Sequence, residues 1–226
     1  MIPLSDKRPT TVKTRIIAQH QQVVRVDEEK DEPFTQETQN LLMEKLLHSR
    51  DKYDGIILSD YNKGLLNYDF IQSVRKNFKN LPVIIDPKGV DYAKYASATA
   101  IKPNWKEFKQ ALNKPCLGFN AIQENAAAMV KELQLQGIII TLGEKGVFVL
   151  DDHNQSRVLP TVARDVFDVS GAGDTFVAAF TAGLLSSGSW LKAAALANIA
   201  SGIVVGKVGT AVVHNKEILD SLNLYD

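Results

Sequence analysis

Four short, almost wholly apolar segments recur along the middle of the chain, and each has a polar residue at or near its end. They are Gly55–Asp60, Pro82–Pro87, Ala98–Lys102 and Gly137–Leu142. Stretches with the apolar spacing of helices lie between them. Apolar strands that alternate with helices are typical of a parallel sheet that is buried on both faces. The sequence therefore predicts an α/β fold with a mostly parallel sheet and helices on both sides.

The same periodicity places one hairpin and the individual helices. The hairpin is predicted to join Gly146–Leu150 to Arg157–Leu159 through a turn at Asp151–Asn154. The helix after this hairpin, Gly173–Ser187, has one apolar face, and Trp190–Val205 is apolar all round, so we expect it to be buried. The other predicted helices are Thr35–Arg50, Tyr68–Phe78, Asn104–Leu112, Gln123–Leu135 and His214–Leu222.

The N-terminal part follows a two-residue period instead. The β-branched runs Thr10–Ile17 and Gln22–Val26, with a turn near Gln19–Gln21, predict an antiparallel ribbon. A ribbon with polar faces is typical of a lid or of a sheet edge. Because no repeat or flexible linker interrupts the chain, we expect one domain over residues 1–226, with the ribbon at about 8–27 and an α/β core at about 35–226.

Composition excludes several classes of protein. Lys and Arg total 26, and Asp and Glu also total 26, so the chain lacks the basic surface that nucleic acid requires. A single cysteine, Cys116, excludes a disulfide framework and a cysteine zinc site. The first eight residues have no apolar core, and Ala193–Gly206 is too short to span a bilayer. We therefore expect a soluble, cytoplasmic protein whose partners are neither nucleic acid nor membrane.

Polar residues follow the predicted strands at one edge of the sheet. Asp60, Asp86, Lys102 and Thr141 each end such a strand. In parallel sheets, ligands bind beyond the carboxyl ends of the strands. The sequence therefore places a ligand site along this row of residues.

The segment Asp168–Phe176 carries the strongest chemical signal in the chain. Gly171 and Gly173 let a ligand approach the backbone, and the helix that follows adds positive potential at the same point. This predicts an anion site, with Asp174 placed to take a proton from an attacking hydroxyl. Taken alone, the segment could also be an ordinary N-capped helix start. Because Phe176 occupies the third glycine position, a dinucleotide fingerprint is disfavoured, and Gly202–Val208 is rejected as a phosphate loop because it ends a helix.

Asp168–Phe176 closely resembles the C-terminal signature of the ribokinase-like (pfkB-type) carbohydrate kinase family, with Val169 in place of the usual Thr. Asn104–Glu107 resembles the family's Asn-x-x-Glu motif, although these two residues alone would also fit a helix capping box. Thr141–Gly146 resembles its nucleotide-side strand and turn, and Ala197–Gly209 resembles the buried helix and loop beside the adenine. The resemblance implies a ribokinase-like fold, ATP and Mg²⁺ as cofactors, and a sugar as substrate.

Within that family the heptose 7-phosphate kinases are the most similar subgroup. The segments that carry this likeness are Arg8–Arg15, Gln21–Asp27, Ser59–Gly64 and Ile85–Gly89, within a resemblance that runs from about Lys7 to Ile218. It implies transfer of the ATP γ-phosphoryl group to the anomeric hydroxyl, giving the 1,7-bisphosphate on the way to ADP-heptose, a lipopolysaccharide precursor. A kinase of another sugar or nucleoside, and a nucleotide-binding module without catalysis, remain as alternatives.

The resemblance also assigns roles to individual residues. Asp174 is the expected catalytic base, and Gly171, Ala172 and Gly173 are the expected anion hole. Asp168, with the stretch 207–209, is the expected K⁺ site, and Asn104 and Glu107 are expected to hold Mg²⁺ through water. The expected nucleotide-binding residues are Asn104, Trp105, Lys106, Glu107, Thr141, Gly143, Gly146 and Asn198, and the expected substrate-binding residues are Lys13, Arg15, Asp60, Lys63, Asp86 and Lys88.

Each of these residues also has a plain structural interpretation. The lysines could be solvated surface charges, while Asp60 and Asp86 could be turn residues after a strand, and Asp168 a loop carboxylate bonded to nearby N–H groups.

Kinases of this kind begin with a longer N-terminal part that carries the first strands and a Gly-Gly substrate motif. They are also joined to a nucleotidyltransferase half with a His-x-Gly-His motif, which does not occur in this sequence. We therefore expect a kinase domain that is incomplete at its N-terminus. Its expected partners are a sugar phosphate, a second copy of the chain in a dimer, and a nucleotidyltransferase domain or the missing N-terminal segment.

Overall fold

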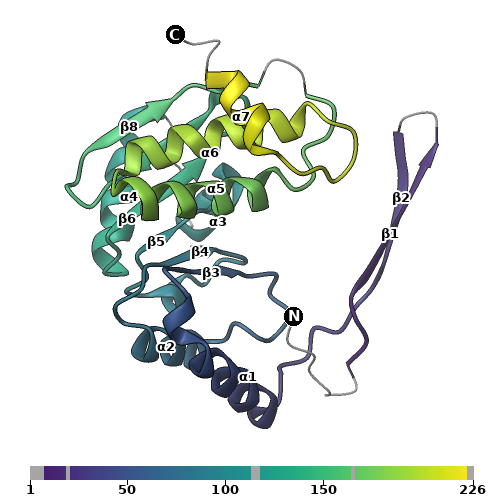
Figure 1. Cartoon of the computed structure of the whole chain (residues 1–226), viewed down its shortest axis with the longest axis vertical. Helices are drawn as coiled ribbons and strands as arrows, with labels where there is room; N and C mark the ends of the chain where they lie inside the picture. The colour runs from purple at the N-terminus through teal and green to yellow at the C-terminus, as the bar shows by residue number, and fades with distance from the viewer. Residues whose placement is uncertain (1–7, 19–20, 113–117, 164–165, 223–226) are drawn as a thin grey trace.

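The computed structural model describes residues 8–18, 21–112, 118–163 and 166–222. A six-stranded sheet forms its centre, with helices on both sides (Figure 1). The strands β3 to β6 are parallel, and β7 and β8 continue the sheet as an antiparallel hairpin. The predicted α/β fold with a mostly parallel sheet is confirmed. In spatial order the strands are β3 (Ile56–Ser59), β4 (Val83–Asp86), β5 (Ala100–Ile101), β6 (Gly137–Thr141), β7 (Val147–Leu150) and β8 (Ser156–Leu159).

Side chains that alternate along the strands form two separate cores. On one face, Ile84 and Ile139 pack beneath α5 (Ala172–Ser187) and α6 (Trp190–Val205), which contribute Phe180 and Trp190. Because successive residues of a strand point to opposite faces, the neighbours of Ile84 and Ile139 enter the other core.

The second core lies between the sheet and three helices. Ile85 and Ile138 pack there with buried side chains of the helices, among them Phe108. Two further helices flank the layers: α1 (Gln36–His48) packs on the outer side of α2, and α7 (Asn215–Leu222) lies against α6 (Figure 1). The three helices of this face are α2 (Tyr68–Asn77), α3 (Trp105–Leu112) and α4 (Gly118–Glu132), and short 3₁₀ turns are η1 (Arg50–Lys52), η2 (Ala93–Tyr95) and η3 (Gly143–Lys145).

Helix α4 is the element whose bounds differ most from the expectation. It begins at Gly118 rather than at Gln123, because Phe119 reaches the sheet and packs edge-on against Phe148 with ring centroids 5.9 Å apart. It ends at Glu132 rather than at Leu135, since Gln134 takes a left-handed backbone angle of φ 54° that stops the helix. Tertiary contact and a local turn thus override the periodicity.

The predicted ribbon forms a separate two-stranded antiparallel sheet that extends away from the body (Figure 1). Its strands are β1 (Val12–Ala18) and β2 (Gln21–Glu28), and β2 runs past the expected end at Val26 because Asp27 pairs with Lys13. Part of the predicted turn near Gln19–Gln21, like Cys116, lies outside the described residues. Within the described part of the chain, no helix has the length and apolar run that crossing a bilayer requires.

Candidate functional site

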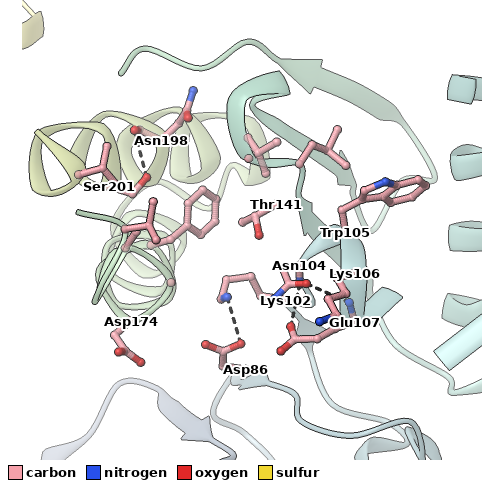
Figure 2. Close-up of a pocket in the computed structure, with 18 of the residues that line it drawn as sticks. Asp86, Lys102, Asn104, Trp105, Lys106, Glu107, Thr141, Asp174, Asn198 and Ser201 are labelled. Atoms are coloured by element: carbon pink, nitrogen blue, oxygen red, sulfur yellow. Dashed lines mark hydrogen bonds and ion pairs between the residues drawn. The ribbon is translucent and has the colours of Figure 1, made fainter. Parts of the chain in front are cut away.

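A cavity of about 930 Å³ lies at the carboxyl ends of the parallel strands. The loops after β3, β4, β5 and β6 form its floor, and the start of α5 and the inner face of α6 form its opposite wall (Figure 2). This is the edge at which the sequence predicted a ligand site, because strand ends of a parallel sheet converge there. The strand-end residues Asp60, Asp86, Lys102 and Thr141 all line the cavity.

The glycine motif turns the chain into α5 at this cavity. Gly171 is the N-cap residue and has φ 80°, a left-handed conformation that favours glycine. Gly173 faces the floor of the cavity: a Cβ atom at this position would lie 3.5 Å from Lys102 Nζ and 3.9 Å from Asp86 Oδ2. The start of α5 at Gly173 and the ammonium group of Lys102 therefore converge on one point, whereas the Ala172 N–H already donates to the Val169 carbonyl oxygen at 3.3 Å. Such a point suits an anion.

Lys102 and Asp86 form an ion pair with 3.0 Å between Nζ and Oδ1, and the Lys102 side chain is only 5% exposed. Burial raises the pKa of Asp86, and the charge of Lys102 and its hydrogen bond act in the opposite direction. The negative charges of Glu107 and Asp174 also act on Asp86, so these carboxylates share one part of the cavity, as Figure 2 shows.

Asn104 and Glu107 form a reciprocal capping box at the start of α3. The Glu107 N–H donates to Asn104 Oδ1 at 2.9 Å, and the Asn104 N–H donates to Glu107 Oε2 at 3.0 Å. The second carboxylate oxygen of Glu107 accepts a hydrogen bond from Lys88 Nζ at 2.9 Å. This interaction is the first cause that raises the pKa of Lys88. The capping box is therefore present, and both side chains also line the cavity; their role toward magnesium stays a prediction.

The expected nucleotide side lies along β6, α3 and α6. Thr141 forms a bridge with Asn104, so these two residues lie next to each other at the cavity wall. Gly146 has φ 89°, and a Cβ atom there would overlap the Leu159 carbonyl oxygen, so this position requires glycine. Asn198, nearly buried, donates from Nδ2 to the Pro160 carbonyl at 2.7 Å and lies at the end of the pocket away from Asp86 (Figure 2). Trp105, Lys106 and Gly143 also line this part of the cavity.

Asp174 lies in the first turn of α5, with its carboxylate in the cavity. Tyr61, in the loop after β3, brings its hydroxyl to 3.1 Å from Asp174 Oδ1 and 3.4 Å from Oδ2. Burial is the first cause that raises the pKa of Tyr61, and the charge of Asp174 is the second. Tyr61 therefore stays protonated near neutral pH and donates to the carboxylate.

Asp60 lines the cavity, but its carboxylate is committed to protein groups. Its side chain is 2% exposed, and Oδ2 accepts from Lys94 Nζ at 2.6 Å and from the Tyr95 hydroxyl at 2.6 Å. Its other oxygen accepts from the Asn62 N–H at 2.7 Å. This arrangement matches the turn-forming interpretation of Asp60, with the buried Tyr95 as an added partner.

Lys13 and Lys63 lie in an ion cluster at the base of the ribbon and do not line the cavity. Lys13 Nζ is 3.1 Å from both Asp27 and Glu29, and Lys63 Nζ is 2.5 Å from both Glu29 and Asp31. Hydrogen bonds from these ammonium groups are the first causes that lower the pKa values of Asp27 and Glu29. The structure thus separates these two lysines from Asp86 and Lys88, which do line the cavity.

Asp168 begins the glycine motif and accepts a hydrogen bond from the Ser170 N–H at 2.8 Å. Hydrogen bonding from Ser170 is the first cause that lowers the pKa of Asp168, and the positive charge of Arg15 and the Gly209 amide add to it. Arg15 therefore acts on the start of the glycine motif from the ribbon. The backbone donors to the Asp168 carboxylate are the N–H groups of Ser170 and Gly209, which matches the interpretation of Asp168 as a loop carboxylate; the cation site stays a prediction.

Tyr61, Tyr95 and the ion pair of Lys102 are the parts of the site that sequence reasoning did not assign. Lys102 was visible as a polar residue at a strand end. Tyr61 lies in the segment Ser59–Gly64 that resembles the heptose 7-phosphate kinases, but no pattern gave it or Tyr95 a role, because their partners lie 113 and 35 residues away in the chain.

Comparisons with known proteins agree with this arrangement. The model of the pfkB family of carbohydrate kinases matches residues 1–217. The chain is 42% identical over 220 residues to the bifunctional protein HldE of Histophilus somni. This match covers 96% of the chain and 45% of that relative. The chain thus spans less than half of this relative's length.

Two solved structures share the fold. One is the ribokinase of Arabidopsis thaliana complexed with ribose and ATP, with a TM-score of 0.74, 20% identity, and coverage of 96% of this chain and 70% of that one. The other is phosphofructokinase-2 of Escherichia coli in complex with potassium, with a TM-score of 0.72, 18% identity, and coverage of 89% and 67%. The extent of the family match and the ribokinase-like fold lead to one conclusion: the chain belongs to the pfkB family of carbohydrate kinases.

Proposed function

We propose that the chain phosphorylates heptose 7-phosphate at its anomeric hydroxyl, with ATP as the phosphoryl donor, and forms the 1,7-bisphosphate. The convergence of Asp174, Gly173 and Lys102 on one point of the cavity is the observation that carries this proposal. A base, a helix start with an N–H donor and a buried cation favour the transfer of a phosphoryl group to a hydroxyl.

In this reaction Asp174 accepts the proton of the attacking hydroxyl. The sugar oxygen forms a bond to the γ-phosphorus, the bond from that phosphorus to the bridging oxygen breaks, and ADP leaves with the electron pair. The N–H group of Gly173 and the ammonium group of Lys102 stabilise the negative charge on the transferred group. Because these donors are fixed by the turn and by the Asp86 ion pair, little reorganisation is needed.

The residues present fit Mg-ATP. Asn104 and Glu107 offer amide and carboxylate oxygens, which are the donors that Mg²⁺ prefers, and they lie beside the cavity where the phosphates would extend. When bound, Mg-ATP supplies the phosphoryl group. Thr141, Gly143, Gly146 and Asn198 line the remaining length of the cavity and would hold the nucleoside.

A potassium site at Asp168 is part of the proposal. Support comes from the place of Asp168 at the start of the glycine motif and from the likeness to a fold relative whose structure is in complex with potassium. Exchange of K⁺ for tetramethylammonium in the assay should lower turnover, and unchanged kinetics would remove this site.

The assignment of the sugar rests on the strand-end loops. The segments Ser59–Gly64 and Ile85–Gly89 resemble the heptose 7-phosphate kinases, and both loops form the floor of the cavity beside Asp174. Lys88, with its side chain half exposed, and Arg15 on the ribbon are the cations that we assign to the sugar phosphate. The relatives are named bifunctional, and the chain spans 45% of one of them, so we assign it the kinase activity alone.

The test measures ADP release by the purified protein with Mg-ATP and one acceptor at a time. The acceptors are heptose 7-phosphate, the unphosphorylated heptose, fructose 6-phosphate and ribose. Turnover should depend on heptose 7-phosphate, and ³¹P NMR of the product should show a new anomeric phosphate. Higher turnover with another acceptor would assign a different sugar, and nucleotide binding without any turnover would support a binding module.

A further inference from the structure

The hydroxyl of Tyr61 connects two parts of the cavity that are far apart in the chain. Tyr61 lies in the loop after β3, and Asp174 lies in the first turn of α5, 113 residues later. The hydroxyl lies 3.1 Å and 3.4 Å from the two oxygens of Asp174, so it contacts both. The carboxylate that we assign as the base is therefore held from the opposite side of the cavity.

This contact leaves room for a substrate. The two oxygens of a carboxylate together offer about four acceptor positions, and one tyrosine hydroxyl donates one proton. A sugar hydroxyl can therefore approach Asp174 while Tyr61 stays in place. The Tyr61 hydroxyl interacts electrostatically with Ser59, Asp86 and Lys88. It therefore lies among the residues of the two loops that we assign to the sugar.

The loop that carries Tyr61 is fixed on both sides of this residue. Before it, the buried carboxylate of Asp60 is held by Lys94 and Tyr95, and it accepts the N–H of Asn62 within the loop itself. After it, Lys63 is paired with acidic residues at the base of the ribbon. A loop that is anchored twice holds its tyrosine in one place.

We propose that Tyr61 is a positioning residue for Asp174: its hydroxyl holds the carboxylate in the orientation from which it takes the proton of the acceptor hydroxyl. This inference rests on the proposed kinase function. Tyr61 keeps its own proton throughout the reaction, and the only proton transferred to the protein goes from the sugar oxygen to Asp174. Loss of the Tyr61 hydroxyl should therefore lower the rate of transfer and leave nucleotide binding intact.

A double-mutant cycle in turnover tests this role, with Tyr61→Phe, Asp174→Asn and the double variant. Tyr61→Phe should lower kcat about tenfold, the effect of one hydrogen bond to a charged group, with KM for ATP changed by less than about twofold. In the Asp174→Asn background the same substitution should have no further effect, because it acts through Asp174. Tyr68→Phe, at an equally exposed tyrosine on α2, should match wild type. Equal effects of Tyr61→Phe in both backgrounds would overturn the proposal.

The same four proteins give a second measurement that needs no activity. If the contact exists in solution, Tyr61→Phe should lower the Tm by about 2 °C in the wild-type background and by less in the Asp174→Asn background. Additive changes in Tm would overturn the inference even in an active enzyme. Absence of sugar-dependent turnover in wild type would instead overturn the proposed function, while coupling in Tm would still support the contact.

Discussion

Asp174 and Asp86 are both carboxylates at one cavity, but their surroundings differ. Asp174 is exposed at a helix start and is held by one tyrosine, whereas Asp86 is part of a buried ion pair. Loss of the Asp174 carboxylate should therefore lower the rate of phosphoryl transfer. Loss of Lys102, the partner of Asp86, should lower the free energy of unfolding.

Asp174→Asn keeps the shape of the side chain and removes its basicity. Turnover should fall about 10²-fold or more, the scale of lost general-base catalysis, with little change in ATP affinity. The measurement is steady-state kinetics together with calorimetry for the nucleotide. Asp69→Asn is a matched control, because Asp69 is an exposed carboxylate in the first turn of α2. Turnover near the wild-type value in Asp174→Asn would remove the assignment of the base.

Lys102→Met should leave the Asp86 carboxylate buried without its cation and cost about 3 kcal/mol of stability at neutral pH. Burial already raises the pKa of Asp86 above 3.8, and removal of Lys102 raises it further. A carboxyl with a raised pKa contributes stability at low pH that is lost as the pH rises through that pKa. The variant should therefore approach wild-type stability near pH 4 and fall below it toward pH 7.

Urea unfolding of both proteins across this range measures the effect. Adding Asp86→Asn to the Lys102→Met variant should abolish the pH-dependent difference. A constant deficit from pH 4 to pH 7 would show that the loss comes from packing rather than from the charge.

The site residues that could be predicted from the sequence are those that interact with residues close to them in the chain. Asn104 and Glu107 belong to one contiguous motif and Gly173 and Asp174 to another, and all four residues line the same cavity; Gly171, the N-cap residue of α5, does not line it. The contacts of Tyr61 and the pairing of Lys63 with Glu29 depend on how distant loops meet. No local sequence pattern predicts these long-range contacts, because they depend on how the strands and helices pack and so bring the loops together.

At the scale of elements, the ribbon is joined to the body by charge rather than by an apolar core. Arg8 reinforces the ion cluster of Lys13, Glu29 and Lys63, because it donates to the carbonyls of Lys30 and Lys63 and stacks over Phe34. Period-two alternation predicted the ribbon, and apolar runs predicted the sheet. The bounds of α4 escaped prediction because Phe119 and Gln134 act through tertiary contact and backbone angle.

Glu29→Gln should loosen the ribbon, because Glu29 links Lys13 of the ribbon to Lys63 of the body. The expected result is faster amide hydrogen exchange in β1 and β2 and no change in β4. In wild type, about 1 M NaCl should produce the same change, since the Debye length is then about 3 Å. Glu28→Gln, for which the described residues give no ion pair, is the control. Exchange that is insensitive to both salt and substitution would show that the ion cluster does not hold the ribbon.

At the scale of the whole molecule, the part of the cavity that we assign to the nucleotide is formed by α3, β6 and α6, which are all part of the body. Saturating Mg-ADP, at about 100 times Kd, should therefore raise the Tm by about 5–10 °C. The double variant Asn104→Ala, Glu107→Ala should lose the dependence of this shift on magnesium. Asn67→Ala, which removes the N-cap of α2 and a hydrogen bond to Gln39 away from the cavity, should keep it. No shift at millimolar nucleotide would contradict the proposed site.

The two edges of the main sheet differ in their protection. Within the described residues, β3 pairs only with β4, and Ile57 on it is 38% exposed. The other edge, β8, carries the exposed charge of Arg157. An apolar edge strand invites pairing with a second chain, and a charge discourages it.

Ile57→Lys should therefore reduce self-association in sedimentation velocity, whereas Val158→Lys on β8 should change it little. Equal effects at both edges would show that net charge rather than edge pairing controls association.

The spatial order of the six strands repeats their order in the chain, from β3 through β8. Each new strand can therefore add to the free side of the strand made just before it, and none has to insert between two that are already paired. During synthesis, when the chain emerges gradually from the ribosome, such a sheet can grow in one direction as residues appear. The glycine turn before α5 follows β8, so the proposed site would be completed only after the sheet beneath it has formed.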